Sequence, residues 1–226
     1  MKPSIARQGA VAALAALAFT LTPATVAWSA PAETPAAEQN KAAHLQPLPT
    51  SPVAYEFGET LAKLSGRELE VTFLAAIIPH HRDAVEMARL ELERGVDPRI
   101  RAHAENMIAN QRHQIEQFTR WLQEWYGLTP EQALREAPEE ARKEIAAMEE
   151  ESRRTMAELR EVPAGKRFDI EFVRRIIPHH NSGIIEFLEP QSRADHAHLK
   201  VAATTGIITQ EAQIADFRTW LSEQDG

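Results

Sequence analysis

The sequence contains no cysteine, and this absence excludes several kinds of site and linkage. Without a thiol the chain can form no disulfide, no thiolate metal centre and no lipid-modified amino-terminal cysteine. Glycine is also scarce, with nine residues in 226, which leaves little room for a glycine-rich phosphate-binding loop. The fold must therefore be held together by its hydrophobic core alone.

Long apolar runs are missing too, apart from one stretch near the amino terminus. Lys2 and Arg7 precede an apolar run from Gly9 to Leu21, and small residues follow. This layout is typical of a secretory signal peptide, and the run is shorter than the about 20 residues that a permanent membrane helix needs. We expect residues 1–29 to be a signal peptide, the protein to be periplasmic or secreted, and no stable membrane span to remain after cleavage.

Basic residues are fewer than acidic ones, 25 against 33, which gives a formal net charge of −8. Removing Lys2 and Arg7 with the signal peptide would make this charge about −10. A strongly negative protein repels phosphate backbones and mildly attracts cations. The charge therefore argues against nucleic acid as a partner.

The hydrophobic pattern divides the rest of the chain. We expect residues 30–60 to form a flexible leader, because Ala, Pro, Gln and Thr are frequent there without a regular period. Apolar residues recur three or four apart from Leu69 onward, which predicts a helix that ends near Gly95. Asp97, followed by proline, marks the start of a second helix that ends at Gly127. The short turn between the helices predicts an antiparallel hairpin.

This hairpin occurs twice. Residues 68–127 align with residues 167–226 at a constant shift of 99 positions, and 17 of the 60 aligned residues are identical. A charged connector, 128–166, separates the two copies; we expect a helix over residues 139–160 of it, lying across the other helices. Neither hairpin can bury its apolar stripe alone. The repeat therefore predicts an all-α fold, a four-helix bundle over residues 61–226.

The most unusual motif, Ile-Ile-Pro-His-His, ends at His81 in the first copy and at His180 in the second. Counting residues back from each turn places four glutamines of the second helices level with these histidines. The predicted layer contains His80, His81, His179, His180, Gln111, Gln114, Gln210 and Gln213. Such a buried layer is costly unless its members pair or hold an ion, and imidazole suits copper, zinc, nickel and iron. A histidine–glutamine hydrogen-bond network without metal is the alternative.

Other residues near the motif have weaker signals. Pro79 and Pro178 each remove a helical amide donor, so we expect each helix to kink or restart there. Met87 and Glu186 occupy matching places, seven residues after the first histidine of their copy. A single ion joining Met87 to the first-copy histidine is not expected over about 10 Å; Glu186 could serve a second ion, neutralise the site or pair with a cation. Asp83 is a candidate to orient the nearby imidazole.

Three further histidines, His113, His196 and His198, have no counterpart in the other copy. We expect them to lie on the surface, with Asp195 as the cap of a helix.

The doubled Phe-x3-Ile-Ile-Pro-His-His segment and the Ile-x2-Gln-x2-Gln-Ile-x2-Phe-x2-Trp-Leu pattern resemble the domain of unknown function 305 family, from about Leu69 to Glu223. The resemblance implies a ferritin-like fold, export and, as in some members, copper binding linked to metal tolerance. It implies metal ligands at His80, His81, His179, His180 and Met87. Ile77, Ile176 and Glu186 stand where members usually have methionine. Fewer thioethers weaken the case for Cu(I), relative to Cu(II) or zinc on imidazole.

Three functions follow from these patterns. The first is an exported metal-binding protein, with copper foremost because it has the highest affinity for nitrogen ligands, and zinc or another transition metal next. The second is a helical interaction or scaffold module whose histidines are structural or sense pH. The third is a ferritin-like metalloenzyme, but a di-iron centre needs Glu-x-x-His motifs that this layer lacks. We therefore expect no enzymatic activity; a metal ion is the expected partner, a protein partner is unknown, and homo-oligomerisation stays open.

Overall fold

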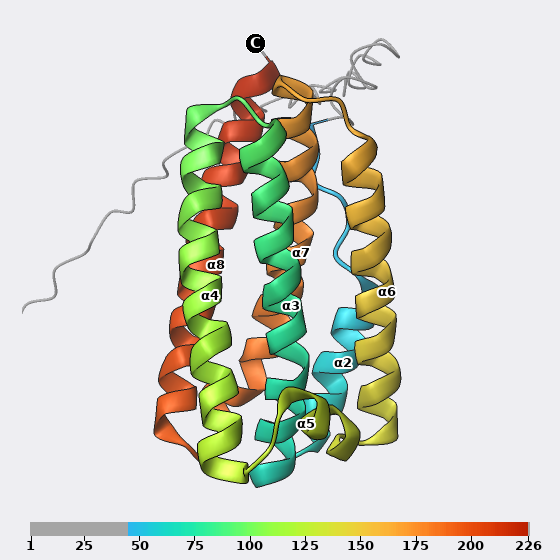
Figure 1. Cartoon of the computed structure of the whole chain (residues 1–226), viewed down its shortest axis with the longest axis vertical. Coiled ribbons are helices and arrows are strands. Elements are labelled where there is room, and N and C mark those ends of the chain that lie inside the picture. Colours follow the sequence, from blue (N-terminus) through green and yellow to red (C-terminus); the bar gives the residue numbers. More distant parts are fainter. Residues whose placement is uncertain (1–44, 226) are drawn as a thin grey trace, which may run out of the picture. The chain divides into compact units, whose positions relative to one another are not determined.

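The computed structural model describes residues 45–225, so the expected signal peptide and residues 30–44 of the expected leader lie outside the described residues. Within residues 45–225 the regular structure is entirely helical, and the all-α prediction is confirmed (Figure 1). The helices are α2 (Pro52–Lys63), α3 (Gly66–Arg94), α4 (Pro98–Tyr126), α5 (Pro130–Glu136), α6 (Glu139–Glu161), α7 (Lys166–Arg193), α8 (Ala197–Ser222) and a terminal 3-10 turn, η1 (Glu223–Asp225).

The long helices pack as two hairpins. Helix α3 packs along α4, α7 packs along α8, and the hairpins meet through α3 and α7 (Figure 1). The turn between α3 and α4 has the expected caps: Asp97 Oδ1 accepts hydrogen bonds from the backbone N–H groups of Arg99 at 2.9 Å and Ile100 at 3.2 Å. Gly127 ends α4 with a φ of 69°, a left-handed conformation that glycine adopts at little cost. Local signals thus set the boundaries of α4.

Replacing Asp97 with alanine should lower the free energy of unfolding by about 1–2 kcal/mol. The carboxylate caps α4, and its Oδ2 also accepts a hydrogen bond from Trp220 Nε1 at 3.0 Å, which ties α4 to α8. Urea denaturation measures the loss. Asp97→Asn is the matched control, because its amide oxygen still accepts at the cap, and it should lose less; equal losses in the two variants would contradict the capping role.

The expectation of a flexible leader as far as residue 60 is wrong for residues 52–60. Helix α2 begins at Pro52, and Ser51 Oγ accepts a hydrogen bond from the Val53 backbone N–H at 3.1 Å. The helix buries Phe57 and Leu61 against α6 and α7. Two large apolar residues four apart are enough to anchor this short helix, but their stripe is too brief to stand out beside a proline-rich segment.

The expectation that the connector lies across the other helices is also wrong. Helix α6 matches the predicted helix within the connector, but it runs lengthwise beside α2, α3 and α7 (Figure 1). Its inward residues are buried near both ends of the helix, at Ala141 and Ile145 and at Met156 and Leu159, and the half-buried Met148 and Ser152 continue the same spacing between them. A stripe that spans the whole helix is covered only when the helix packs lengthwise against its neighbours, which is the arrangement that α6 adopts.

Helix α7 does not restart at Pro178, and α3 is likewise continuous through Pro79. Pro178 has no N–H, which leaves the carbonyl of Arg174 without its helical partner. The Leu48 backbone N–H donates to this carbonyl at 2.9 Å. Asn181 Nδ2 further donates to Thr50 Oγ1 at 3.0 Å. The extended segment before α2 is therefore held along α7 at the level of the Pro-His-His motif.

Large buried apolar side chains form two clusters, with the histidines at their boundary. One cluster contains Phe73, Phe118 and Phe187, and the other contains Phe172 and Phe217. On α3 the residues up to position 78 belong to the first cluster, and those from position 84 onward belong to the second. The polar layer therefore lies between two well-packed apolar regions, which hold its backbone in place.

Candidate metal centre

The structure brings together the first histidine of each motif. The ring centroids of His80 and His179 lie 4.0 Å apart, with an angle of 49° between the ring planes. His80 comes from α3 and His179 from α7, so the pair sits where the two hairpins meet. His80 Nε2 and His179 Nδ1 are buried and have no hydrogen-bond partner. These two nitrogens are available to an ion.

The second histidine of each motif lies deeper. His81 and His180 are fully buried, with ring centroids 6.1 and 6.3 Å from those of His80 and His179. His81 packs 5.9 Å from the ring of Phe118, and His180 packs 6.3 Å from the ring of Phe217. None of their ring nitrogens has a partner that meets hydrogen-bond geometry. The four imidazoles thus form one central pair and two flanking rings.

Burial decides the charge of three of these rings. It lowers the pKa of His81 and His179 well below the ordinary value, and nearby His80 adds to the effect in both cases. Burial, followed by His80, lowers the pKa of His180 to about 3. These three imidazoles are therefore neutral at neutral pH, and the neutral ring is the form that binds metals.

Glu186 gives His80 a different environment. Burial acts to lower the pKa of His80, but the carboxylate of Glu186 outweighs it, and the pKa is raised. The Nδ1 atom of His80 lies 2.9 Å from Oε1 of Glu186, which is itself fully buried. A carboxylate that holds one imidazole nitrogen and leaves the other free is the arrangement that orients histidine ligands of metals. Glu186 takes the orienting role that Asp83 was expected to have; Asp83 contributes less to the His80 pKa and contacts Ser152.

A glycine gives the central pair its space. A Cβ atom on Gly183 would lie 2.6 Å from Oε1 of Gln210 and 3.1 Å from Nε2 of His80. Because Gly183 of α7 has no side chain, the Gln210 amide of α8 and the His80 imidazole of α3 can both lie against its backbone. Gln114 and Gln213 lie against His81 and His180 in the same layer.

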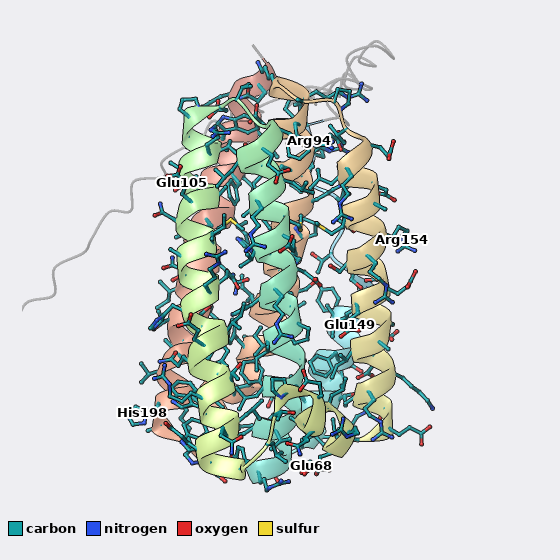
Figure 2. The ribbon with its side chains drawn as sticks, viewed as in Figure 1. Glu68, Arg94, Glu105, Glu149, Arg154 and His198 are labelled. Carbon is teal, nitrogen blue, oxygen red and sulfur yellow. The ribbon has the colours of Figure 1, made fainter. Side chains whose placement is uncertain are left out.

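The central pair lines a cavity of about 130 Å³ between α3, α6 and α7. Glu186 and Met87 lie at its buried end, and Glu149 of α6, which is labelled in Figure 2, lies at its half-exposed end. Among residues 45–225, no three histidine, aspartate or glutamate side chains converge as a ready cluster of metal ligands. The arrangement therefore offers a pair of imidazole nitrogens and an oriented carboxylate.

One of the remaining histidines has an unexpected role. His113 and His198 are exposed, as predicted, and His198 is labelled in Figure 2. The N-cap position of α8 is His196, not Asp195, and its side chain makes no capping hydrogen bond; its ring instead stacks on that of Trp125, with centroids 3.8 Å apart. The His196 backbone N–H donates to Oε1 of Glu70 at 2.8 Å. This contact anchors the turn between α7 and α8, and the sequence carries no signal for it beyond a carboxylate at a buried position.

The fold and the site define a class of protein: all-helical, built from two long hairpins, with paired histidines at their junction. The chain belongs to the family described as domain of unknown function (DUF305), whose model matches residues 70–221. The resemblance noted in the sequence is therefore confirmed. No curated protein matches the chain.

Several solved structures share the fold. The apo form of CopM is 22% identical, with a TM-score of 0.56, over 70% of this chain and 98% of that chain. The Cu(I)-bound form of CopM matches 70% of this chain and 98% of that chain, with a TM-score of 0.52. A DUF305 protein from Streptomyces coelicolor, described as secreted, is 21% identical, with a TM-score of 0.58, over 68% of this chain and 92% of that chain. No helix within residues 45–225 is long and apolar enough to cross a membrane.

Proposed function

We propose that this chain is an exported copper-binding protein that holds the ion as cargo on His80 and His179. In this proposal the two copies of the hairpin form a ferritin-like four-helix bundle, and the ion sits where the hairpins meet. The observation that carries the proposal is the pair of imidazoles 4.0 Å apart, each with a buried ring nitrogen that has no partner. Buried polar atoms are rarely left unpaired without a purpose such as binding an ion.

The chemistry of the layer supports copper as the ion. Imidazole nitrogen is a good ligand for copper, and copper binds nitrogen sites more tightly than other divalent first-row metals do. Glu186 supplies a negative charge beside the pair, which offsets part of the cost of burying a cation. No ring nitrogen of His81 or His180 has a partner that meets hydrogen-bond geometry, although Gln114 and Gln213 lie against these rings. The flanking rings are thus candidates for further ligands.

The relatives agree with this assignment. CopM has been solved in Cu(I)-bound, Cu(II)-bound and silver-bound forms, and it shares the fold of this chain. The signal-peptide layout of residues 1–29 and the secreted relative support export. We propose binding without catalysis, in a role such as copper tolerance, and we place the protein in the periplasm or outside the cell.

The test is a competition titration of the metal-free protein with Cu(I), Cu(II) and zinc. We expect tight copper binding at a fixed stoichiometry, and a loss of affinity of at least about 100-fold in the His80→Ala/His179→Ala variant, because both central imidazoles are gone. The matched control is His113→Ala/His198→Ala, which removes two exposed histidines and should leave the affinity unchanged.

Circular dichroism of each variant should show the helical content of the original protein, since only side chains in a polar layer change. Weak binding that is equal in the original protein and in the central variant would contradict the proposed function.

A further inference from the structure

The outward face of α8 carries a stripe of uncharged side chains that no part of residues 45–225 covers. Helix α8 packs mainly on α7, and the members of the stripe recur alternately four and three positions apart. All of them are exposed: Val201, Thr205, Ile208, Ala212, Ala215 and Thr219. Val201 and Ile208, at 65% and 61%, are the two most exposed large apolar side chains within residues 45–225. Apolar side chains that gather along one exposed face mark an interaction site, whereas single ones do not.

The first copy of the hairpin shows that the fold does not require this stripe. The equivalent positions of α4, at the same shift of 99 residues, are also exposed and hold Ala102, Asn106, Ala109, His113, Glu116 and Arg120. The two helices have the same place in their hairpins, yet only α8 lacks charged and strongly polar groups on this face. The difference therefore reflects what the face of α8 contacts, and not how a hairpin packs.

The spacing of the stripe indicates what covers it. Apolar residues alternately four and three apart form the seam of a coiled coil, which a second helix with an equivalent seam fills. We propose that α8 pairs with α8 of a second copy of this chain, in antiparallel orientation, with Thr205 at the two-fold axis. Such an interface uses the same surface on both subunits and must be complementary to itself. This inference goes beyond the proposed function and does not depend on copper.

The stripe and its flanking charges are complementary to themselves in this orientation. Val201 precedes Thr205 by four residues and Ile208 follows it by three, so Val201 of each copy lies against the partner's Ile208. Lys200 and Glu211 share one flank of the stripe, because eleven residues make about three helical turns. The same flanks face each other in an antiparallel pair, which sets Lys200 of each copy against the partner's Glu211. Neither Lys200 nor Glu211 forms an ion pair with any of residues 45–225.

A lipid surface fits this stripe less well. Helices that lie in a membrane interface carry many basic residues beside their apolar face. Helix α8 instead balances two basic residues, Lys200 and Arg218, with two acidic ones, Glu211 and Asp216. The antiparallel pair overlaps by about 25 Å, which makes a contact smaller than a standard stable interface. We therefore expect a reversible dimer that forms at micromolar concentrations.

The experiment measures the monomer–dimer equilibrium of the metal-free protein by sedimentation equilibrium. We expect Val201→Glu/Ile208→Glu to weaken dimerisation by at least about 100-fold, because carboxylates would be buried in the seam. The matched control is Ala102→Glu/Ala109→Glu, which places the same groups at the equivalent exposed positions of α4 and should leave the equilibrium unchanged. All substituted residues are exposed, so circular dichroism should show the original helical content.

A charge exchange tests the partner and the orientation. Lys200→Glu should weaken dimerisation by about 10-fold, because two carboxylates would then face each other, and Lys200→Glu/Glu211→Lys should restore it to within about threefold. A protein that stays monomeric, or an exchange that fails to restore the dimer, would overturn the inference. So would binding to phosphatidylcholine and phosphatidylglycerol vesicles that Val201→Glu/Ile208→Glu abolishes while the dimer persists.

The dimer and the copper site can fail separately. The His80→Ala/His179→Ala variant should dimerise as the original protein does, since neither histidine belongs to α8. Conversely, Val201→Glu/Ile208→Glu should keep the copper affinity of the original protein within about twofold. A dimer without copper binding would refute the proposed function alone, and copper binding by a protein that never dimerises would refute this inference alone.

Discussion

Replacing Glu70 with alanine should lower the free energy of unfolding by about 3–5 kcal/mol. Glu70 is fully buried, and its carboxylate receives three groups: the His196 backbone N–H at 2.8 Å, His196 Nδ1 at 2.6 Å and the Tyr126 hydroxyl. Burial alone would raise the pKa of Glu70, but these hydrogen bonds outweigh it and lower the pKa. Without the carboxylate, the His196 backbone N–H and the half-buried Tyr126 hydroxyl lose their acceptor, which is costly, while the more exposed His196 ring can still reach water.

Chemical denaturation of the variant measures this loss. Glu68→Ala is the matched control, because Glu68 lies two residues earlier on α3 and is exposed near the same end of the helices (Figure 2). A surface substitution of this kind should change stability by no more than about 0.5 kcal/mol. Glu70→Gln should fall between the two, since an amide oxygen still accepts. A Glu70→Ala loss as small as that of Glu68→Ala would refute the anchoring role.

Replacing Glu91 with glutamine should stabilise the protein at alkaline pH. Glu91 and Asp169 are fully buried carboxyl groups in contact, next to the turn between α3 and α4. Asp169 Oδ1 accepts hydrogen bonds from the backbone N–H groups of Val96 at 2.9 Å and Asp97 at 3.1 Å. Burial, followed by the hydrogen bond and charge of Asp169, raises the pKa of Glu91 from 4.5 to about 9. The folded protein therefore keeps a proton on Glu91 at neutral pH.

The pH dependence follows from this difference. Between about pH 4.5 and 9 the unfolded chain releases the proton of Glu91 and the folded chain retains it. Stability conferred by the protonated pair is thus fully present below pH 4.5 and is lost as the pH rises, by up to about 1.4 kcal/mol per pH unit. In Glu91→Gln the amide can donate to Asp169 and has no proton to lose. The variant should therefore lose less stability over this range and be more stable than the original protein by a few kcal/mol near pH 8.

Denaturation curves recorded from pH 5 to pH 9 check this prediction. Glu93→Gln, two residues further along α3 and exposed, removes the same charge without touching Asp169. Its stability should follow the pH dependence of the original protein. Parallel curves for Glu91→Gln and the original protein would show that Glu91 does not hold its proton through this range.

The sequence was sufficient wherever the signal is local or repeated. Asp97 and Gly127 set the ends of α4 because capping depends on a few neighbouring residues. The repeat placed His80 and His179 in one layer, since equivalent residues of two similar hairpins lie at the same level. The packing of α6 was missed because a helical period does not say which neighbours a helix faces. The inward residues of α6 extend from Ala141 to Leu159, and this length, rather than the number of apolar residues, indicates that the helix packs lengthwise.

The inner details of the site depend on how α3, α6 and α7 are rotated about their axes. The contact between His80 and Glu186 joins two helices that are far apart in the sequence, and no spacing rule predicts it. The sequence placed His81 and His180 in the buried layer; their full burial arises because α3 and α7 each have helices packed on several sides. Met148 lines the cavity, and its place there could not be predicted until α6 was seen along α3 and α7.

The matching positions of Met87 and Glu186 have a consequence for how such a site can arise. Both side chains line the cavity, yet they occupy equivalent places in the two copies of the hairpin. A homodimer of identical hairpins would present the same residue twice, either two thioethers without a charge or two carboxylates that repel each other. Two copies within one chain can mutate independently, so one can supply sulfur while the other supplies the balancing charge. The asymmetry of this pair of side chains is therefore not available to a homodimer of identical hairpins.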